Sequence, residues 1–179
     1  MGYNPQARRR RSIRLPKYDY SQPGAYFITI VTEGRKGLFG EIHDGIMHLS
    51  EAGQIVWEIW NSLPVRYPDV GVGTAQVMPN HFHGIVNILA TSDPTVGEIH
   101  ETPVPDRRRM TLPLVVGYFK MNTAKQINIL LGREGVPVWQ RNYYEHIIRD
   151  ENDYHRVHRY IEANVSNWGM DDENQLKAR

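Results

Sequence analysis

The segment VGVGTAQVMPNHFHGIVNIL, residues 70–89, decides the fold. Two runs rich in apolar and β-branched residues, 70–77 and 82–89, are separated by little more than Met78-Pro79-Asn80. Such a short join cannot hold the crossover that parallel strands need, so the two runs are predicted to be antiparallel strands. The segment therefore predicts an antiparallel sheet with a His-x-His triplet at the start of its second strand.

Strand-like and helical patterns alternate along the rest of the chain. Residues 25–32 are almost continuously apolar or β-branched, which favours a central strand. Ser50 and Asp150 each precede a helical pattern and are predicted N-caps, and Pro64 and Pro68 are predicted to end the first helix. The further predicted elements are strands at 46–49, 138–140 and 144–148, a helix from 51 whose end Pro64 and Pro68 bound, a helix at 112–131, and a last helix from 151 to about 168.

The order of the main elements is strand, helix, strand, strand, helix, strand, with the last helix after them. This order is typical of the split βαβ pattern of a ferredoxin-like sandwich, so the predicted fold class is α+β with an antiparallel sheet and a C-terminal helix. A length of 179 residues fits one domain with tails. We expect a basic N-terminal arm at 1–24, the domain at 25–168 and a polar tail at 169–179.

The composition excludes several kinds of site and location. The chain has no cysteine, which excludes disulfides, thiolate metal sites and cysteine nucleophiles. No run approaches the ~18 apolar residues of a membrane span, and arginines at 8–11 are followed by no apolar stretch. We therefore expect a cytoplasmic protein in which any metal has nitrogen and oxygen ligands.

The formal net charge is only +1, but the charges are segregated along the chain. Residues 1–37 carry eight Lys or Arg against two acidic residues, and residues 107–149 again carry eight against two. Two basic blocks in a nearly neutral chain are typical of a protein that binds a phosphate backbone. A solvated surface with a basic tail is the alternative explanation of the same composition.

The triplet His81-Phe82-His83 is the sharpest local feature. Side chains alternate along a strand, so the two imidazoles lie on one face and Phe82 on the other. Neutral imidazole binds Mn²⁺, Zn²⁺ and other divalent metals, and a pair at alternate positions can chelate one ion. The triplet alone also fits a histidine that is hydrogen-bonded in the core.

Tyr160 and Asn164 form a second candidate group. On the last predicted helix they lie one turn apart, along one flank of its apolar stripe. A phenol and a carboxamide in this position can serve one site. A half-buried tyrosine with its hydroxyl in water is the alternative.

Three motifs in order carry a family resemblance: MPNHFHGI at 78–85, WQRNYYEHIIR at 139–149 and YIEAN at 160–164. Together they resemble the HUH single-tyrosine transposases, and most of all the REP-associated tyrosine transposases, over residues 25–168. The resemblance implies the HUH endonuclease fold, with His81 and His83 as the histidine pair, Tyr160 as the nucleophile and Asn164 as a polar metal ligand. Val165 departs from the family, which usually has proline there.

The resemblance also implies an activity. The implied activity is that of a metal-dependent transposase and endonuclease. Such an enzyme cleaves and rejoins single-stranded DNA at hairpin-forming repeats, through a 5′-phosphotyrosine intermediate. The implied cofactor is Mg²⁺ or Mn²⁺, held by His81, His83 and Asn164. The implied partner is single-stranded or hairpin DNA in the prokaryotic cytosol or nucleoid, with no membrane; a monomer and a homodimer are both open. The residues expected to bind the DNA backbone or stack on bases are Arg107, Arg108, Arg109, Lys120, Lys125, Trp139, Arg141 and Arg149, with Tyr143 and Tyr144 as further stacking candidates.

Two other functions remain as alternatives. One is a domesticated module that binds nucleic acid on the same fold without catalysis, against which the intact Tyr160 and Asn164 argue. The other is a His-x-His metallohydrolase that uses activated water, which would need a carboxylate base near the histidines, and the strand offers none close by. Four other tyrosines remain rivals as the nucleophile: Tyr143, Tyr144, Tyr154 and Tyr118. Tyr118 lies in the other helix, and Tyr154 lies on the stripe expected to pack inward.

Overall fold

A four-stranded antiparallel sheet is the centre of the computed structural model, which describes residues 18–90 and 110–170. The strand order is β4 (Val70–Val77), β5 (His81–Ile88), β1 (Gly24–Val31) and β6 (Tyr144–Ile148). Each strand is antiparallel to its neighbour, so β1 and β4 run parallel with β5 between them. This is the split βαβ arrangement, and the predicted ferredoxin-like fold class is confirmed.

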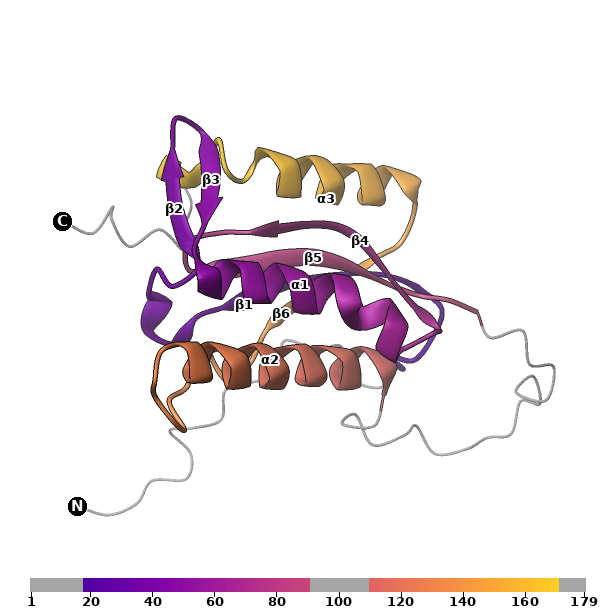
Figure 1. Cartoon of the computed structure of the whole chain (residues 1–179). Helices are drawn as coiled ribbons and strands as arrows, with labels where there is room; N and C mark the ends of the chain where they lie inside the picture. Colours follow the sequence, from indigo (N-terminus) through magenta and orange to yellow (C-terminus); the bar gives the residue numbers. More distant parts are fainter. Residues whose placement is uncertain (1–17, 91–109, 171–179) are drawn as a thin grey trace, which may run out of the picture.

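The helices are divided between the two faces of the sheet. Helices α1 (Glu51–Arg66) and α2 (Thr111–Leu130) lie together on one face, and α3 (Glu151–Ala163) lies on the other (Figure 1). Among the described residues, no helix is both long enough and apolar enough to cross a membrane. The sheet thus has one broad covered face and one face served by a single helix.

A small hairpin interrupts the connection between β1 and α1. Strands β2 (Gly40–His43) and β3 (Ile46–Leu49) pair with each other and form a separate two-stranded sheet. The predicted strand at 46–49 is therefore present, with residues 40–43 as its partner. The short 3₁₀ helix η2 (Glu33–Arg35) precedes the hairpin.

Both predicted N-caps are confirmed. Ser50 Oγ accepts a hydrogen bond from the Gly53 amide at 3.1 Å at the start of α1, and Asp150 Oδ1 accepts one from the Asp153 amide at 2.8 Å at the start of α3. Each cap satisfies one of the amides that a helix leaves without a partner at its first turn.

Helix α1 continues through Pro64 and ends at Arg66, between the two prolines predicted to bound its end, because the Tyr67 amide still bonds to the Leu63 carbonyl. Two other predicted boundaries were wrong. Helix α3 ends at Ala163 rather than near residue 168, and a short 3₁₀ helix, η4 (Trp168–Met170), follows. Residues 138–140 form one isolated bridge between Thr32 and Trp139 instead of a strand, because β1 ends at this point.

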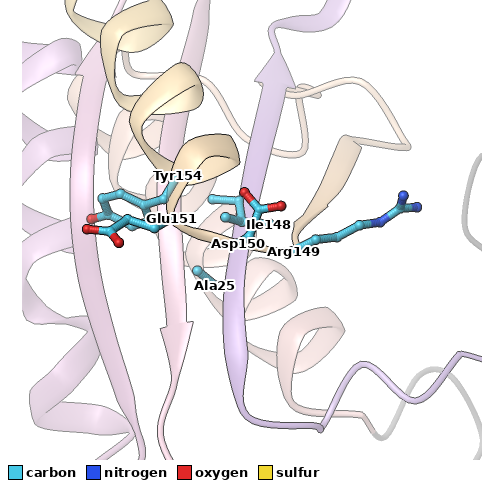
Figure 2. Close-up of a pocket in the computed structure, with 6 residues that line it drawn as sticks. All are labelled: Ala25, Ile148, Arg149, Asp150, Glu151 and Tyr154. Carbon is cyan, nitrogen blue, oxygen red and sulfur yellow. The ribbon is translucent and has the colours of Figure 1, made fainter.

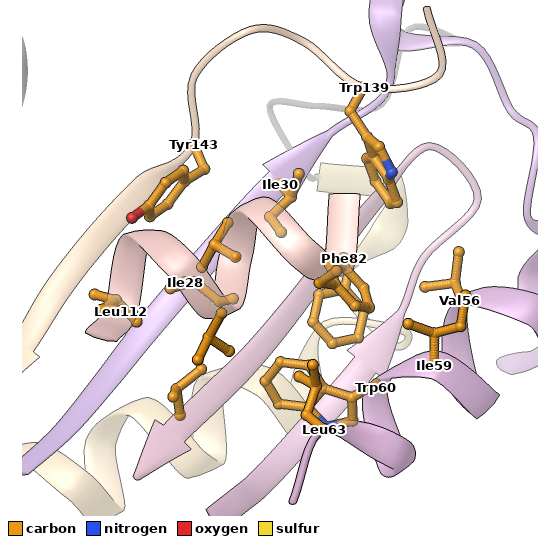
Figure 3. Close-up of a cluster of buried hydrophobic side chains, with 14 of the residues drawn as sticks. Ile28, Ile30, Val56, Ile59, Trp60, Leu63, Phe82, Leu112, Trp139 and Tyr143 are labelled. Atoms are coloured by element: carbon orange, nitrogen blue, oxygen red, sulfur yellow. The ribbon is translucent and has the colours of Figure 1, made fainter. Parts of the chain in front are cut away.

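The main hydrophobic core lies between the sheet and the pair α1 and α2. Alternate residues of the central strands point into it, among them Ile28 and Ile30 of β1 and Phe82 of β5 (Figure 3). Trp60 of α1 packs on Phe82, with ring centroids 4.8 Å apart. Burial of these large side chains is the main source of the stability of the domain.

A second, smaller cluster fixes α3 on the other face. It consists of Phe27 of β1, Ile85 of β5, and Val157 and Ile161 of α3, all buried. Val157 and Ile161 are one turn apart, so they present one stripe to the sheet. The small size of this cluster leaves part of the face for polar side chains.

Part of the segment expected as an N-terminal arm packs on the domain. Tyr20 is buried in the main core, and its carbonyl accepts a hydrogen bond from the Leu112 amide at 3.1 Å. Residues 18–23 therefore belong with the start of α2. Residues 1–17 and the expected tail from 171 lie outside the described residues.

We predict that Gly84→Ala destabilises the domain. A Cβ at Gly84 would lie 2.7 Å from two atoms of the Trp60 ring and 2.9 Å from Phe82. Overpacking of this kind costs about 1–3 kcal/mol of the free energy of unfolding, to be measured by urea denaturation.

Gly117→Ala in α2 is the matched control, because a Cβ there meets nothing within 4 Å. Replacing an exposed helical glycine by alanine is expected to stabilise by about 0.5–1 kcal/mol. Equal stability of Gly84→Ala and the unmodified protein would contradict the close packing of Trp60.

Candidate active site

The two histidines of the triplet converge on the face of the sheet that α3 covers. They are the first and third residues of β5, and both are buried, His81 completely. Their Nε2 atoms are 2.9 Å apart. The predicted common face is therefore confirmed, and the two ring nitrogens can serve one site.

Each imidazole is also held at its other nitrogen. His81 Nδ1 lies 2.9 Å from Asn80 Oδ1, and His83 Nδ1 lies 2.8 Å from the Thr29 hydroxyl. Thr29 is the residue directly opposite His83 in the β1–β5 ladder. Contacts of this kind fix the orientation of a histidine ring and leave its Nε2 for a ligand.

The buried position favours the neutral form of His83. Burial, and next the neighbouring His81, lower the pKa of His83 well below its usual value. A neutral imidazole has a lone pair for a metal, whereas the protonated form has none.

Tyr160 lies beside the histidine pair. Its ring centroid is 5.4 Å from that of His83 and 5.9 Å from that of Phe27, which itself stacks on His83 at 5.5 Å. The tyrosine is 51% exposed, although it neighbours buried groups. One face of the ring is thus fixed against the site while a large substrate can still reach it.

Asn164 is the residue directly after α3, at its C-cap. It is buried, and its Oδ1 atom has no hydrogen-bond partner. Four residues before it Tyr160 contacts His83, and four residues after it Trp168 contacts His81 at 5.9 Å between ring centroids. A buried carboxamide oxygen without a partner is costly, so this atom is available to a ligand.

The donor set fits a divalent cation. Two neutral imidazole nitrogens and one carboxamide oxygen suit Mn²⁺, while Mg²⁺ accepts the oxygen and prefers to retain water or phosphate ligands. Among the described residues, no group of three or more His, Asp and Glu side chains is arranged to hold a metal. A cation at the histidine pair would therefore need Asn164 or the substrate as a further ligand.

Two of the residues expected to bind DNA have structural roles instead. Trp139 is buried in the main core, and its Nε1 donates to the Thr123 hydroxyl at 2.8 Å, so the expected stacking on bases is wrong for this residue. Lys120 Nζ donates to the carbonyls of Gln140 and Arg141 at 2.6 and 3.1 Å. This lysine ties α2 to the segment before β6 rather than facing a phosphate.

The other expected DNA contacts are spread over the molecule. Arg141 is exposed and follows Gln140, whose amide bonds to Val31, the residue opposite His81. Lys125 is exposed on α2, on the far side of the sheet from Tyr160. Residues 107–109, Arg107, Arg108 and Arg109, lie outside the described residues. Arg141 is thus the described basic residue of this group nearest the histidine end of the sheet.

A shallow hollow of about 290 Å³ lies at the opposite end of α3. Figure 2 shows Tyr154 and Glu151 of α3 above Ala25 of β1, with Arg149 extending away. Tyr154 and Tyr160 are six residues apart, which is about 9 Å along a helix. The hollow is therefore separate from the histidine pair, and Tyr154 is not placed to be the nucleophile.

Sequence patterns missed four residues of this site. Thr29 and Asn80 orient the histidines, Phe27 stacks on His83, and Trp168 lies against His81. Asn80 precedes the triplet and its position was a usable signal. The register of β1 with β5 brings Thr29 and Phe27 to the site, and this register cannot be derived from a single sequence.

Comparison with known proteins agrees with this description. No protein-family model matches the chain. A Haemophilus influenzae protein of uncharacterized function is 36% identical over 173 residues, which cover 94% of this chain and 95% of that protein. The structure of a REP-associated tyrosine transposase bound to a REP hairpin has a TM-score of 0.56 at 19% identity, covering 89% of this chain and 76% of that one.

The likeness to the solved REP-associated tyrosine transposase shows that the two proteins share the predicted fold. At the level of sequence, the chain belongs to one family with the Haemophilus influenzae protein.

The start of α3 is anchored by Asp153, and we predict that this anchor stabilises the domain above acidic pH. Its carboxylate accepts from Arg156, from His146 Nε2 at 2.8 Å and from the Arg149 amide. The Arg156 hydrogen bond is the main cause that lowers the pKa of Asp153 from 3.8 to about 2. A lowered folded-state pKa gives stability that is complete above pH about 4 and is lost as the pH falls toward 2.

Asp153→Asn should therefore lower the free energy of unfolding at pH 7 by about 1–2 kcal/mol and flatten its pH dependence between about 4 and 2. Urea denaturation at several pH values measures both effects. Glu151→Gln is the control, because the exposed Glu151 has only a 3.6 Å contact with His155. A change in Glu151→Gln as large as that in Asp153→Asn would contradict the anchor.

Proposed function

We propose that the protein is a metal-dependent single-stranded DNA endonuclease and transposase, which cleaves and rejoins DNA through a tyrosine–phosphate link. The observation that carries this proposal is the contact of the half-exposed Tyr160 with His83, beside two converging imidazole nitrogens. All of these side chains come from one chain. The proposed site accordingly uses side chains of one chain.

Tyr160 would attack the phosphorus of the scissile phosphodiester. The bond from phosphorus to the 3′ oxygen breaks, which leaves a 5′-phosphotyrosine and a free 3′-OH. A phenol with a pKa of about 10 is a weak nucleophile near neutral pH. A divalent cation held by His81, His83 and Asn164 would polarise the phosphate and offset the charge that develops on it.

Rejoining is the reverse attack, by a 3′-OH on the phosphotyrosine. The phosphotyrosine retains the bond energy of the phosphodiester, so no nucleotide cofactor is needed. Phe27 holds one side of the Tyr160 ring, and the exposed side remains for the DNA. The fixed ring restricts the direction from which the phenol oxygen approaches phosphorus.

The proposed partner is single-stranded DNA next to a hairpin. The REP-associated transposase with the same fold was captured on a REP hairpin, which supports DNA of this kind as the partner. Tyr144 is 46% exposed and its ring meets that of Phe27 edge-on at 6.3 Å, which supports a role in stacking on a base. Arg141 would contact a backbone phosphate nearby.

The two alternatives explain less of the site. A binding-only module needs neither a fixed, half-exposed tyrosine nor a buried amide oxygen without a partner. In the described residues, no carboxylate joins the histidine pair in a metal-binding group, which leaves a water-activating hydrolase without its base.

We predict that Tyr160→Phe abolishes the covalent protein–DNA adduct and retains DNA binding, because only the attacking oxygen is removed. A labelled single-stranded hairpin with Mg²⁺ or Mn²⁺, analysed on denaturing gels, detects the adduct. Tyr154→Phe is the matched control on the same helix and should form the adduct normally. An adduct that persists in Tyr160→Phe would show that another residue is the nucleophile.

A second prediction concerns the metal and the number of chains. His83→Ala, and excess EDTA with the unmodified protein, should each abolish cleavage while Phe82 and Val86 keep the core intact. An equimolar mixture of His83→Ala and Tyr160→Phe should stay inactive, because each site lies within one chain. Cleavage in EDTA would exclude the metal, and cleavage by the mixture would show that two chains exchange residues.

A further inference from the structure

The outer nitrogens of the two histidines have partners of different kinds. The Asn80 amide donates from Nδ2 to the Arg35 carbonyl at 3.2 Å, and its Oδ1 faces His81 Nδ1 at 2.9 Å. A backbone carbonyl only accepts, so it fixes which end of the amide faces His81. Nδ1 of His81 therefore carries a proton, and in the neutral ring its Nε2 has a lone pair.

His83 has a partner that imposes no such choice. The Thr29 hydroxyl, 2.8 Å from His83 Nδ1, can either donate or accept a hydrogen bond. The pairing of Thr29 with His83 in the sheet fixes the distance between the two groups. Both neutral tautomers of His83 are thus compatible with its surroundings.

The two Nε2 atoms are 2.9 Å apart, and this distance selects one tautomer of His83 when the two rings are hydrogen-bonded to each other. Two lone pairs would repel at this distance, and an N–H···N hydrogen bond fits it. Since His81 Nε2 has no proton, His83 Nε2 must donate. The Thr29 hydroxyl then donates to His83 Nδ1.

A cation bound by both imidazoles requires a different arrangement, because each Nε2 must then offer a lone pair. We infer that His83 changes tautomer when the histidine pair binds a divalent cation, and that the Thr29 hydroxyl is the positioning group that permits the change. The inference rests on the proposed metal site. His83 loses a proton from Nε2 and gains one at Nδ1, so the ring stays neutral and no net proton is released.

In the cation-bound form the Thr29 hydroxyl accepts from His83 Nδ1, whereas His81 keeps its tautomer throughout. Asn80 thus accepts a hydrogen bond from its histidine in both forms, whereas the Thr29 hydroxyl changes from donor to acceptor. Loss of an outer hydrogen-bond partner of a metal-binding histidine typically lowers metal affinity by about 10–100-fold. Removal of the Thr29 hydroxyl should have an effect of this size.

Nuclear magnetic resonance of the full chain labelled with ¹⁵N-histidine tests the tautomers directly. Long-range ¹H–¹⁵N spectra distinguish protonated from bare ring nitrogens, and His81→Gln and His83→Gln assign the signals. Without metal we expect the proton on Nδ1 of His81 and on Nε2 of His83. With Mg²⁺ we expect it on Nδ1 of both. A proton on Nδ1 of His83 before Mg²⁺ is added would overturn the inference.

Binding of Mn²⁺, followed by electron paramagnetic resonance, tests the role of Thr29. Thr29→Val keeps the shape of the side chain and should bind Mn²⁺ about 10–100-fold more weakly, whereas Thr29→Ser should bind with close to the original affinity. Equal affinity of Thr29→Val and the unmodified protein would contradict the role of the hydroxyl. If Thr29→Val fails to fold, the spectra of the unmodified chain still decide the question.

The same measurements separate this inference from the proposed function. Binding of Mn²⁺ and Mg²⁺ without a change in the His83 tautomer contradicts the inference alone. Failure of the unmodified protein to bind Mn²⁺ contradicts the metal site and the tautomer change together.

Discussion

The alternation of side chains along β5 is the constraint on which the rest of the structure depends. Phe82 and Val86 point into the main core, while His81, His83 and Ile85 point toward α3. Both faces of this strand are covered, so a slip of one residue would bury the imidazoles in the main core and turn Phe82 toward α3. One register therefore sets both the position of the histidines and the packing of the core, and a side chain at Gly84 would clash with the Trp60 ring.

Much of this arrangement could be predicted because it follows from the spacing of residues that are close together in the sequence. The triplet places His81 and His83 on one face by the period of a strand, and the four-residue spacing places Tyr160 and Asn164 on one flank of a helix. The caps at Ser50 and Asp150 follow from side chains that bond to amides three residues on. Each of these predictions needed only residues close together in the sequence.

Predictions that depended on distant residues were less reliable. Trp139 is an aromatic residue of the kind that stacks on bases. Thr123, sixteen residues earlier, supplies the hydrogen-bond acceptor that lets its indole enter the core. Lys120 likewise meets carbonyls about twenty residues away. Thr29 gave no signal at all, because its role arises only when β1 lies beside β5. Such contacts follow from the sheet register, which a single sequence leaves open.

The double use of β5 has a consequence for how descendants of this protein would change. If selection for activity ceased, Phe82, Gly84 and Val86 would still be retained, because the main core needs them. The imidazoles, Thr29 and Asn164 lie outside the main hydrophobic core and would be replaced first. Relatives that retain the apolar residues of this strand therefore share the fold. Whether they share an activity is better judged from the histidines, Thr29 and Asn164.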